Sequence, residues 1–220
     1  MANLKIIIFS LFLFVLLMPY KGTSQDSNFG NWLIYIGNVK LKNNWDFHNE
    51  VQYRNYDAVG DLEQLLLRTG LGYTFNEGKN NVLFGYGYIL SENYFDDSDD
   101  KISVNEHRIF QQFISKQKIG RTKLTHRYRF EQRFIEEDFK MRFRYFLSIN
   151  IPFFKSKKLY FSVYDEIFLN TESNVFDRNR LYVGLGYHLT SKIRLEAGYM
   201  NQFFETSGRD QLNIIAFVNL

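Results

Sequence analysis

The feature that most constrains this chain is an alternation of side-chain character in two segments, 124–134 and 140–150. Alternate positions are mainly charged or polar, as in Arg127-x-Arg129-x-Glu131-x-Arg133 and Arg142-x-Arg144. The positions between them are mainly apolar and often aromatic, including Tyr128, Phe130, Phe134, Phe143 and Tyr145. Successive side chains of a β-strand point to opposite faces. The stretch is therefore predicted to be a hairpin with one aromatic face and one face of guanidinium groups.

The same alternation recurs along almost the whole chain. Roughly eleven strand-like segments are separated by turn signals, over residues 31–41, 45–56, 64–75, 82–90, 105–118, 122–134, 140–150, 159–170, 178–189, 193–204 and 211–220. Single-chain bacterial barrels have an even number of strands, so about ten or twelve are expected, with either a short strand at 26–30 or one mis-split segment. The alternation breaks where Arg108 is close to Gln111 and where Asp165 adjoins Glu166, and a β-bulge is expected at both places.

The connections between segments predict a membrane barrel. Short or tight ones (42–44, 76–80, 120–121, 154–157, 190–192) alternate with longer or more acidic ones (57–62, 94–103, 135–139, 171–177, 205–210). Outer-membrane barrels have short periplasmic turns and longer external loops. We therefore expect a transmembrane antiparallel up-and-down β-barrel of 10–12 strands with a charged lumen, external longer loops and a periplasmic C-terminus.

The N-terminus reads as an export signal. Lys5 precedes an apolar core over residues 6–18, Pro19 ends that core, and small residues allow cleavage near 24/25. We expect residues 1–24 to be a signal peptide and 25–220 to be a single barrel domain. No later apolar run has the length of a membrane-spanning helix, so strands would have to cross the membrane.

Composition excludes several classes of function. Basic and acidic residues nearly balance once the signal is removed, which gives no indication of a nucleic-acid partner. The chain has no Cys, which excludes disulfides and thiol chemistry. Aromatic residues make up 18% of the chain, as expected of barrels with aromatic girdles. The expected partners are outer-membrane lipid, lipopolysaccharide and, during insertion, the barrel-assembly machinery, with a monomer as the default state.

A set of strand motifs carries a family resemblance. The motifs are Glu50-x-Gln52-x-Arg54, Glu106-His107-Arg108-x-x-Gln111, Arg127-x-Arg129-x-Glu131-x-Arg133, Arg142-x-Arg144-Tyr145 and Asn179-Arg180-x-x-x-Gly184-x-Gly186-Tyr187. With them the chain resembles the DUF2490 family, uncharacterised outer-membrane β-barrel proteins found mainly in Bacteroidetes-type bacteria. The resemblance spans the mature chain. It implies an outer-membrane location, a barrel and a charged lumen, and no biochemical activity.

The candidate site is the charged face that would line the lumen. Besides His48, it consists of Glu50, Arg54, Arg68, Glu106, Arg108, Arg127, Arg129, Glu131, Arg133, Arg142, Arg144, Glu166, Arg180, Arg194 and Glu196. Opposed Arg and Glu side chains can form bidentate, charge-assisted hydrogen bonds. A structural ion-pair network that fills the barrel is the favoured interpretation, because an unpaired buried charge is costly. The alternative is an anion-attracting narrow pore, since Arg outnumbers Glu in this set.

Enzymatic and cofactor functions find little support in the sequence. Outer-membrane lipid hydrolases place a His and a Ser two residues apart on one strand, and no His-x-Ser occurs here. The acidic run at 96–100 lacks the glycine and terminal Glu of a calcium loop, and no other metal or cofactor motif is present. We expect no catalytic residues, metal or cofactor. Two alternatives stay open: an enzyme that modifies lipid or lipopolysaccharide, and a soluble periplasmic β-barrel binding protein with an aromatic core.

Overall fold

A computed structural model describes residues 29–57, 60–95, 98–153, 156, 158–172 and 174–220. The expected signal peptide at 1–24 lies outside these residues. No helix among the described residues is long and apolar enough to cross a membrane.

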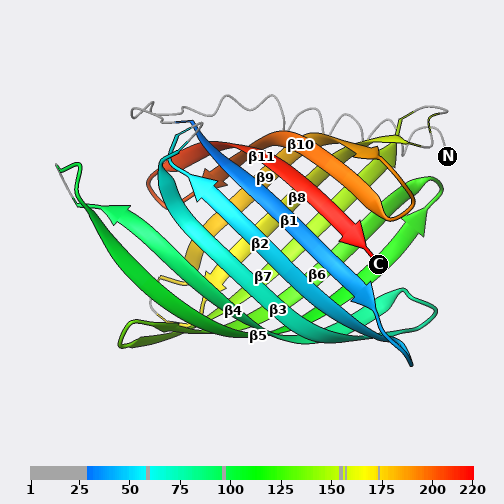
Figure 1. Cartoon of the computed structure of the whole chain (residues 1–220), viewed down its shortest axis with the longest axis horizontal. Helices are drawn as coiled ribbons and strands as arrows, with labels where there is room; N and C mark the ends of the chain where they lie inside the picture. Colours follow the sequence, from blue (N-terminus) through cyan, green and yellow to red (C-terminus); the bar gives the residue numbers. More distant parts are fainter. Residues whose placement is uncertain (1–28, 58–59, 96–97, 154–155, 157, 173) are drawn as a thin grey trace.

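The described chain is all β. Eleven strands form a single closed barrel (Figure 1). They are β1 (Gly30–Lys40), β2 (Trp45–Asn55), β3 (Leu62–Phe75), β4 (Asn80–Tyr94), β5 (Lys101–Ile119), β6 (Thr122–Ile135), β7 (Asp138–Pro152), β8 (Leu159–Asn170), β9 (Phe176–His188), β10 (Ile193–Phe203) and β11 (Gly208–Asn219). Each strand pairs antiparallel with its neighbours in the sequence, which confirms the up-and-down arrangement and the range of 10–12 strands.

The barrel is closed by a parallel seam between its first and last strands. With eleven strands, β1 and β11 run in the same direction, side by side in Figure 1. They pair from Gly30 opposite Gln211 to Asn38 opposite Asn219. The expectation of an even strand number, ten or twelve, is therefore wrong. A parallel ladder satisfies the backbone groups of both edges as an antiparallel one does, so closure does not require an even number.

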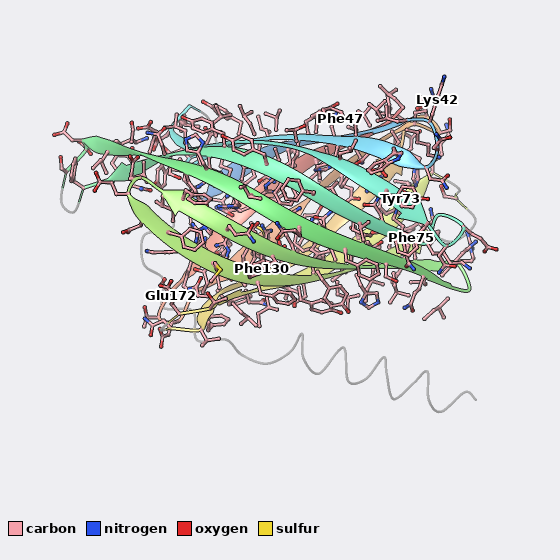
Figure 2. The ribbon with its side chains drawn as sticks, turned by 90° about the horizontal axis from the view of Figure 1, so that it is seen from below. Lys42, Phe47, Tyr73, Phe75, Phe130 and Glu172 are labelled. Atoms are coloured by element: carbon pink, nitrogen blue, oxygen red, sulfur yellow. The ribbon has the colours of Figure 1, made fainter. Side chains whose placement is uncertain are left out.

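The barrel is apolar outside and charged inside. Large apolar side chains on the outer wall are exposed, for example Phe84 at 60% and Leu185 at 54%. Figure 2 shows Phe47, Tyr73 and Phe75 on the outside of this wall. Charged side chains at the intervening positions are buried inside, among them Glu131 at 0% and Arg129 at 2% exposure. The alternation that predicts the strands therefore also sorts their side chains between wall and lumen.

The two ends of the barrel differ in charge but hardly in loop length. Connections at both ends have six residues or fewer, because strands such as β4 and β5 extend into the expected loops. The predicted contrast in loop length is thus largely absent. At the acidic end, the charged residues of the described connections are Asp57, Asp61, Asp99, Asp100, Glu136, Glu137, Glu172 and Glu205. At the basic end they are Lys42, Lys79, Arg121, Lys158 and Lys192, with Glu77 the single acidic residue among those described. Figure 2 shows Lys42 and Glu172 at opposite ends.

The two expected β-bulges are not where the sequence placed them. β5 pairs with β4 and β6 in continuous register, so Arg108 and Gln111 lie on an unbroken strand. The irregularity near Asp165 and Glu166 occurs later, between Phe168 and Leu169. A further register shift lies between Arg54 and Asn55. The alternation of β5 breaks for another reason, which is that Phe110 points into the lumen and is fully buried there.

We predict that Gly85→Ala destabilises the barrel. A Cβ atom at Gly85 would overlap the ring of the buried Phe110 and lie close to the backbone carbonyl of Thr69. Overpacking of this kind costs about 1–3 kcal/mol, so the midpoint of unfolding followed by circular dichroism should fall. Gly87→Ala is the matched control, because the nearest atom to its Cβ is 3.2 Å away on the Arg68 side chain. Equal midpoints for the two variants would contradict the prediction.

Candidate functional site

The structure gathers the predicted lumen residues inside the barrel. They lie on the inward positions of β2, β3 and β5 to β10, and most are buried. Arg127, Arg133 and Arg194 are the more exposed members, with 21%, 17% and 27% of their side chains accessible. Several ion pairs connect residues on different strands, so the charged face of the sequence becomes a three-dimensional network.

Glu131 on β6 is the centre of this network. Arg142 on β7 lies directly opposite Glu131 in the register and donates to Oε2 from Nε at 3.1 Å and Nη2 at 2.7 Å. Arg144 donates from Nη1 to Oε1 at 2.7 Å, and Arg108 from β5 donates to the same oxygen at 3.4 Å. Both carboxylate oxygens of Glu131 thus accept charge-assisted hydrogen bonds from guanidinium groups, and two nitrogens of Arg142 converge on Oε2.

The arginines on the same strand as Glu131 contribute less to its binding. Arg129 lies 3.7 Å from Glu131 through Nη1, and Arg133 pairs with Glu106 instead. The reason is geometric, because directly opposed residues on adjacent strands are closer together than residues two apart on one strand. Glu131 is therefore bound mainly by arginines of the neighbouring strands, with Arg129 as a more distant ion-pair partner.

Two further carboxylates extend the network on either side. Glu106 accepts from Arg108 at 2.6 Å and from Arg133 at 2.7 Å. Glu166 accepts from Arg144 Nη2 at 2.6 Å and from Arg127 Nη2 at 2.7 Å. Since Arg108 and Arg144 each also reach Glu131, the three carboxylates are linked through shared guanidinium groups. We call this set the central network: Glu106, Arg108, Arg127, Glu131, Arg133, Arg142, Arg144 and Glu166.

Two predicted pairs lie apart from the central network. Glu50 accepts from Arg68 at 2.9 Å, and His48 Nε2 lies 3.5 Å from the same carboxylate. Glu196 lies 3.3 Å from Arg194 and accepts from the hydroxyl of Tyr160 at 2.6 Å. Both carboxylates are therefore also bound.

Arg129 and Arg180, which have no close carboxylate partner, are bound mainly by neutral groups. Arg129 donates to Gln112 Oε1 at 2.9 and 2.6 Å, and its guanidinium carbon lies 4.7 Å from the centre of the Phe110 ring. Arg180 donates to Gln202 Oε1 at 2.8 Å and lies 3.9 Å from Glu166. Amide oxygens and ring faces thus stabilise guanidinium groups that the glutamates do not pair closely.

Two aromatic rings hold several of these arginines. The guanidinium carbons of Arg54 and Arg180 lie 3.7 and 4.7 Å from the centre of the Trp32 ring. Those of Arg144 and Arg180 lie 4.3 and 4.5 Å from the centre of the Phe168 ring. The sequence interpretation missed these partners of the arginines: Gln112, Gln202, Trp32, Phe110, Phe168 and Tyr160. The sequence could have indicated them, because each lies at a position that the alternation assigns to the lumen.

The middle of the lumen is packed rather than hollow. Phe110, Phe168, Tyr182 and Met200 point inward and are almost completely inaccessible to solvent, as are Arg129 and Glu131. Trp32 and Ile34 join Tyr182 and Met200 in an apolar cluster near the seam. The lumen is therefore a solid interior of salt bridges and rings at this level.

Other candidate chemistry does not assemble into a site among the described residues. No group of three or more His, Asp or Glu side chains there could hold a metal ion. On the outer wall, His107 contacts the Tyr86 hydroxyl at 2.6 Å and His126 contacts that of Tyr145 at 2.9 Å. Asp96 and Asp97 of the acidic run lie outside the described residues.

Comparison with known proteins gives a family and two individual similarities. The family model DUF2490, a protein of unknown function, matches residues 29–213. An uncharacterised protein of Methylorubrum extorquens is 31% identical over 185 residues, which cover 78% of this chain and 77% of that protein. Among solved structures, LpxR from Salmonella typhimurium superposes with a TM-score of 0.48 and 11% identity, over 93% of this chain and 92% of that one.

We predict that Glu131→Gln strongly destabilises the barrel. The substitution leaves Arg108, Arg142 and Arg144 without the carboxylate that they share, and breaking a buried pair costs about 3–5 kcal/mol. The free energy of unfolding in denaturant measures this loss. Glu137→Gln, in an exposed connection at the end of the same strand, is the control and should have no effect. A loss no larger than that of the control would show that the network contributes little to stability.

Proposed function

This chain belongs to the DUF2490 family, and we propose that it is a non-enzymatic outer-membrane β-barrel whose lumen is closed and whose role is structural. The observation that carries the proposal is the inverted polarity of the barrel. Apolar side chains cover the outside, while salt bridges fill the inside.

The outer wall supports a lipid environment. Monomeric soluble proteins rarely expose contiguous apolar patches larger than about a few hundred Å². Here exposed apolar side chains occur on all eleven strands, from Leu33 on β1 to Leu212 and Ile214 on β11. A closed barrel pairs the backbone of every strand internally, which a strand needs in order to cross a bilayer.

Aromatic residues near both ends support the same placement. Trp45, Tyr73 and Tyr187 lie on the outer wall toward the basic end. Tyr53 and Tyr94 lie on it toward the acidic end, and both are exposed. Membrane barrels place girdles of such side chains at the two interfaces. We infer that the basic end, where β11 finishes, faces the periplasm and that the acidic end faces outward, toward lipopolysaccharide.

The packed interior favours a structural role over a pore. An anion-conducting pore needs a continuous passage lined by available positive charge. The arginines of the central network are already bound to carboxylates, and Phe110 and Phe168 fill the space beside them. We therefore infer that the excess of Arg over Glu serves packing and not ion attraction.

We predict that the full-length protein fractionates with outer membranes and is heat-modifiable. A folded, detergent-resistant barrel should migrate differently on a cold gel before and after boiling, because its strands stay paired until heated. Membranes from cells that express the chain, separated by density, provide the sample. A soluble periplasmic band without a mobility shift would overturn the membrane placement, and the outer wall would then have to bind a protein partner.

We predict no steady ion conductance from the purified barrel in a planar lipid bilayer. The double variant Phe110→Ala/Arg129→Ala removes two side chains from the packed middle and should raise conductance above the wild-type level. Heat-modifiability of the variant checks that it still folds. A steady, ion-selective conductance of the wild-type protein would contradict the closed lumen and favour the pore.

A further inference from the structure

A second cluster of positive charge lies at the basic end of the barrel, away from the central network. It surrounds an open cavity of about 450 Å³, which is lined by Lys123, Lys158, His188, Leu189, Thr190 and Ser191. Three separate segments supply these residues, namely the start of β6, the residue before β8, and the end of β9 with its following turn. The cavity is therefore built by the fold and not by a single loop.

Backbone and ring contacts hold the walls of this cavity in place. The amide of His188 donates to the carbonyl of Lys158 at 2.8 Å, which ties the two lining segments together. The His188 ring packs against the Tyr160 ring with centroids 5.0 Å apart. In the turn, Thr190 Oγ1 accepts from the amides of Lys192 and Ile193 at 3.1 and 3.0 Å. A ligand would meet a largely preformed site.

The lysines of the cavity differ from the arginines of the lumen in having no carboxylate partner. Among the described residues, no ion pair joins Lys123 or Lys158 to an acidic group. Lys158 Nζ lies 5.9 Å from the centre of the Tyr187 ring, which is an uncharged neighbour. Lys123 lies opposite another cation, Lys118, in the β5–β6 register. Like charges directly opposed across strands repel each other, and a bound anion would relieve that repulsion.

The two acidic side chains in the lumen near the basic end, Asp46 and Glu196, are bound to other residues. Asp46 accepts from Thr74 at 3.0 Å and from Asn81 at 2.7 Å. Glu196 accepts from Tyr160 and pairs with Arg194. Neither carboxylate forms an ion pair with Lys123 or Lys158, and no acidic residue of the described chain lines the cavity, so the lining carries a net positive charge.

We propose that this cavity binds a phosphate-bearing anion, either a small phosphomonoester or the headgroup of a phospholipid. Two ammonium groups offer six N–H donors and match the charge of a dianion, and Lys is an established phosphate-binding residue. The hydroxyl of Ser191 and the imidazole of His188 add further polar groups to the lining. The volume lies in the range of about 300–1,000 Å³ that is typical of small-molecule sites, and exceeds the need of a bare phosphate.

The test is calorimetric titration of the detergent-purified, full-length protein. Inorganic phosphate and glycerol 3-phosphate are the soluble probes, and mixed micelles with or without phosphatidylglycerol are the lipid probe. We expect saturable binding of a phosphate probe by the wild-type protein. Preference for glycerol 3-phosphate would indicate a soluble ligand, and preference for phosphatidylglycerol micelles would indicate a headgroup. Absence of binding with every probe would overturn the proposal.

Variants of the two lysines assign the binding to the cavity. Lys123→Gln/Lys158→Gln should weaken binding about tenfold or more, because it removes both charges. Lys79→Gln is the matched control at the same end, since Lys79 is exposed and already pairs with Glu77 at 3.1 Å. An unchanged affinity of the double variant, or an equal loss in the control, would overturn the site. Conductance and fractionation measure the proposed function separately, so its failure would be distinguishable from a failure here.

Discussion

The structure depends on neutralising guanidinium groups in an interior from which water is excluded. A buried charge without a partner costs several kcal/mol, so every arginine in the lumen has to find an acceptor or a ring face. Glu131 forms salt bridges with three arginines at once. Arg129 and Arg180, which lie farther from any glutamate, donate hydrogen bonds to Gln112 and Gln202. The shape of the packed interior follows from this requirement, since the amides and rings must lie beside the guanidinium groups.

The same requirement fixes how the strands are paired. A slip of one residue would turn the arginines of a strand onto the apolar wall and its aromatic residues into the lumen. The salt bridges across β5 to β8 therefore act together with the outer wall to specify register. The parallel seam is stabilised differently, because Trp32 and Ile34 on β1 pack with Ile215 on β11 and with Tyr182 and Met200. Burial of apolar side chains in the lumen thus stabilises the pairing of β1 with β11, where few charged residues lie.

The sequence could predict faces but not neighbours. Alternation identified the strands to within a few residues and sorted Arg129, Glu131 and Phe130 correctly between lumen and wall. It could not show that Glu131 binds Arg142, because that contact depends on the register between two strands. The parallel pairing of β1 with β11 joins opposite ends of the chain, and local patterns contain no information about it. The fold was therefore largely predictable from residue periodicity, whereas the connections within the site were not.

The arginines of the central network and the lysines of the basic-end cavity occupy different parts of the barrel, and their chemistry explains the division. Arginine has a planar fork of donors that suits bidentate pairing and stacking on rings, and it occupies the packed middle of the lumen. Lysine carries a compact, strongly hydrated charge on a flexible stem, and Lys123 and Lys158 lie at the open mouth without carboxylates. An anion that entered this mouth would meet a packed floor instead of a passage. The arginines in the middle of the barrel therefore stabilise its interior through salt bridges, while the lysines at the basic end are available to bind a ligand.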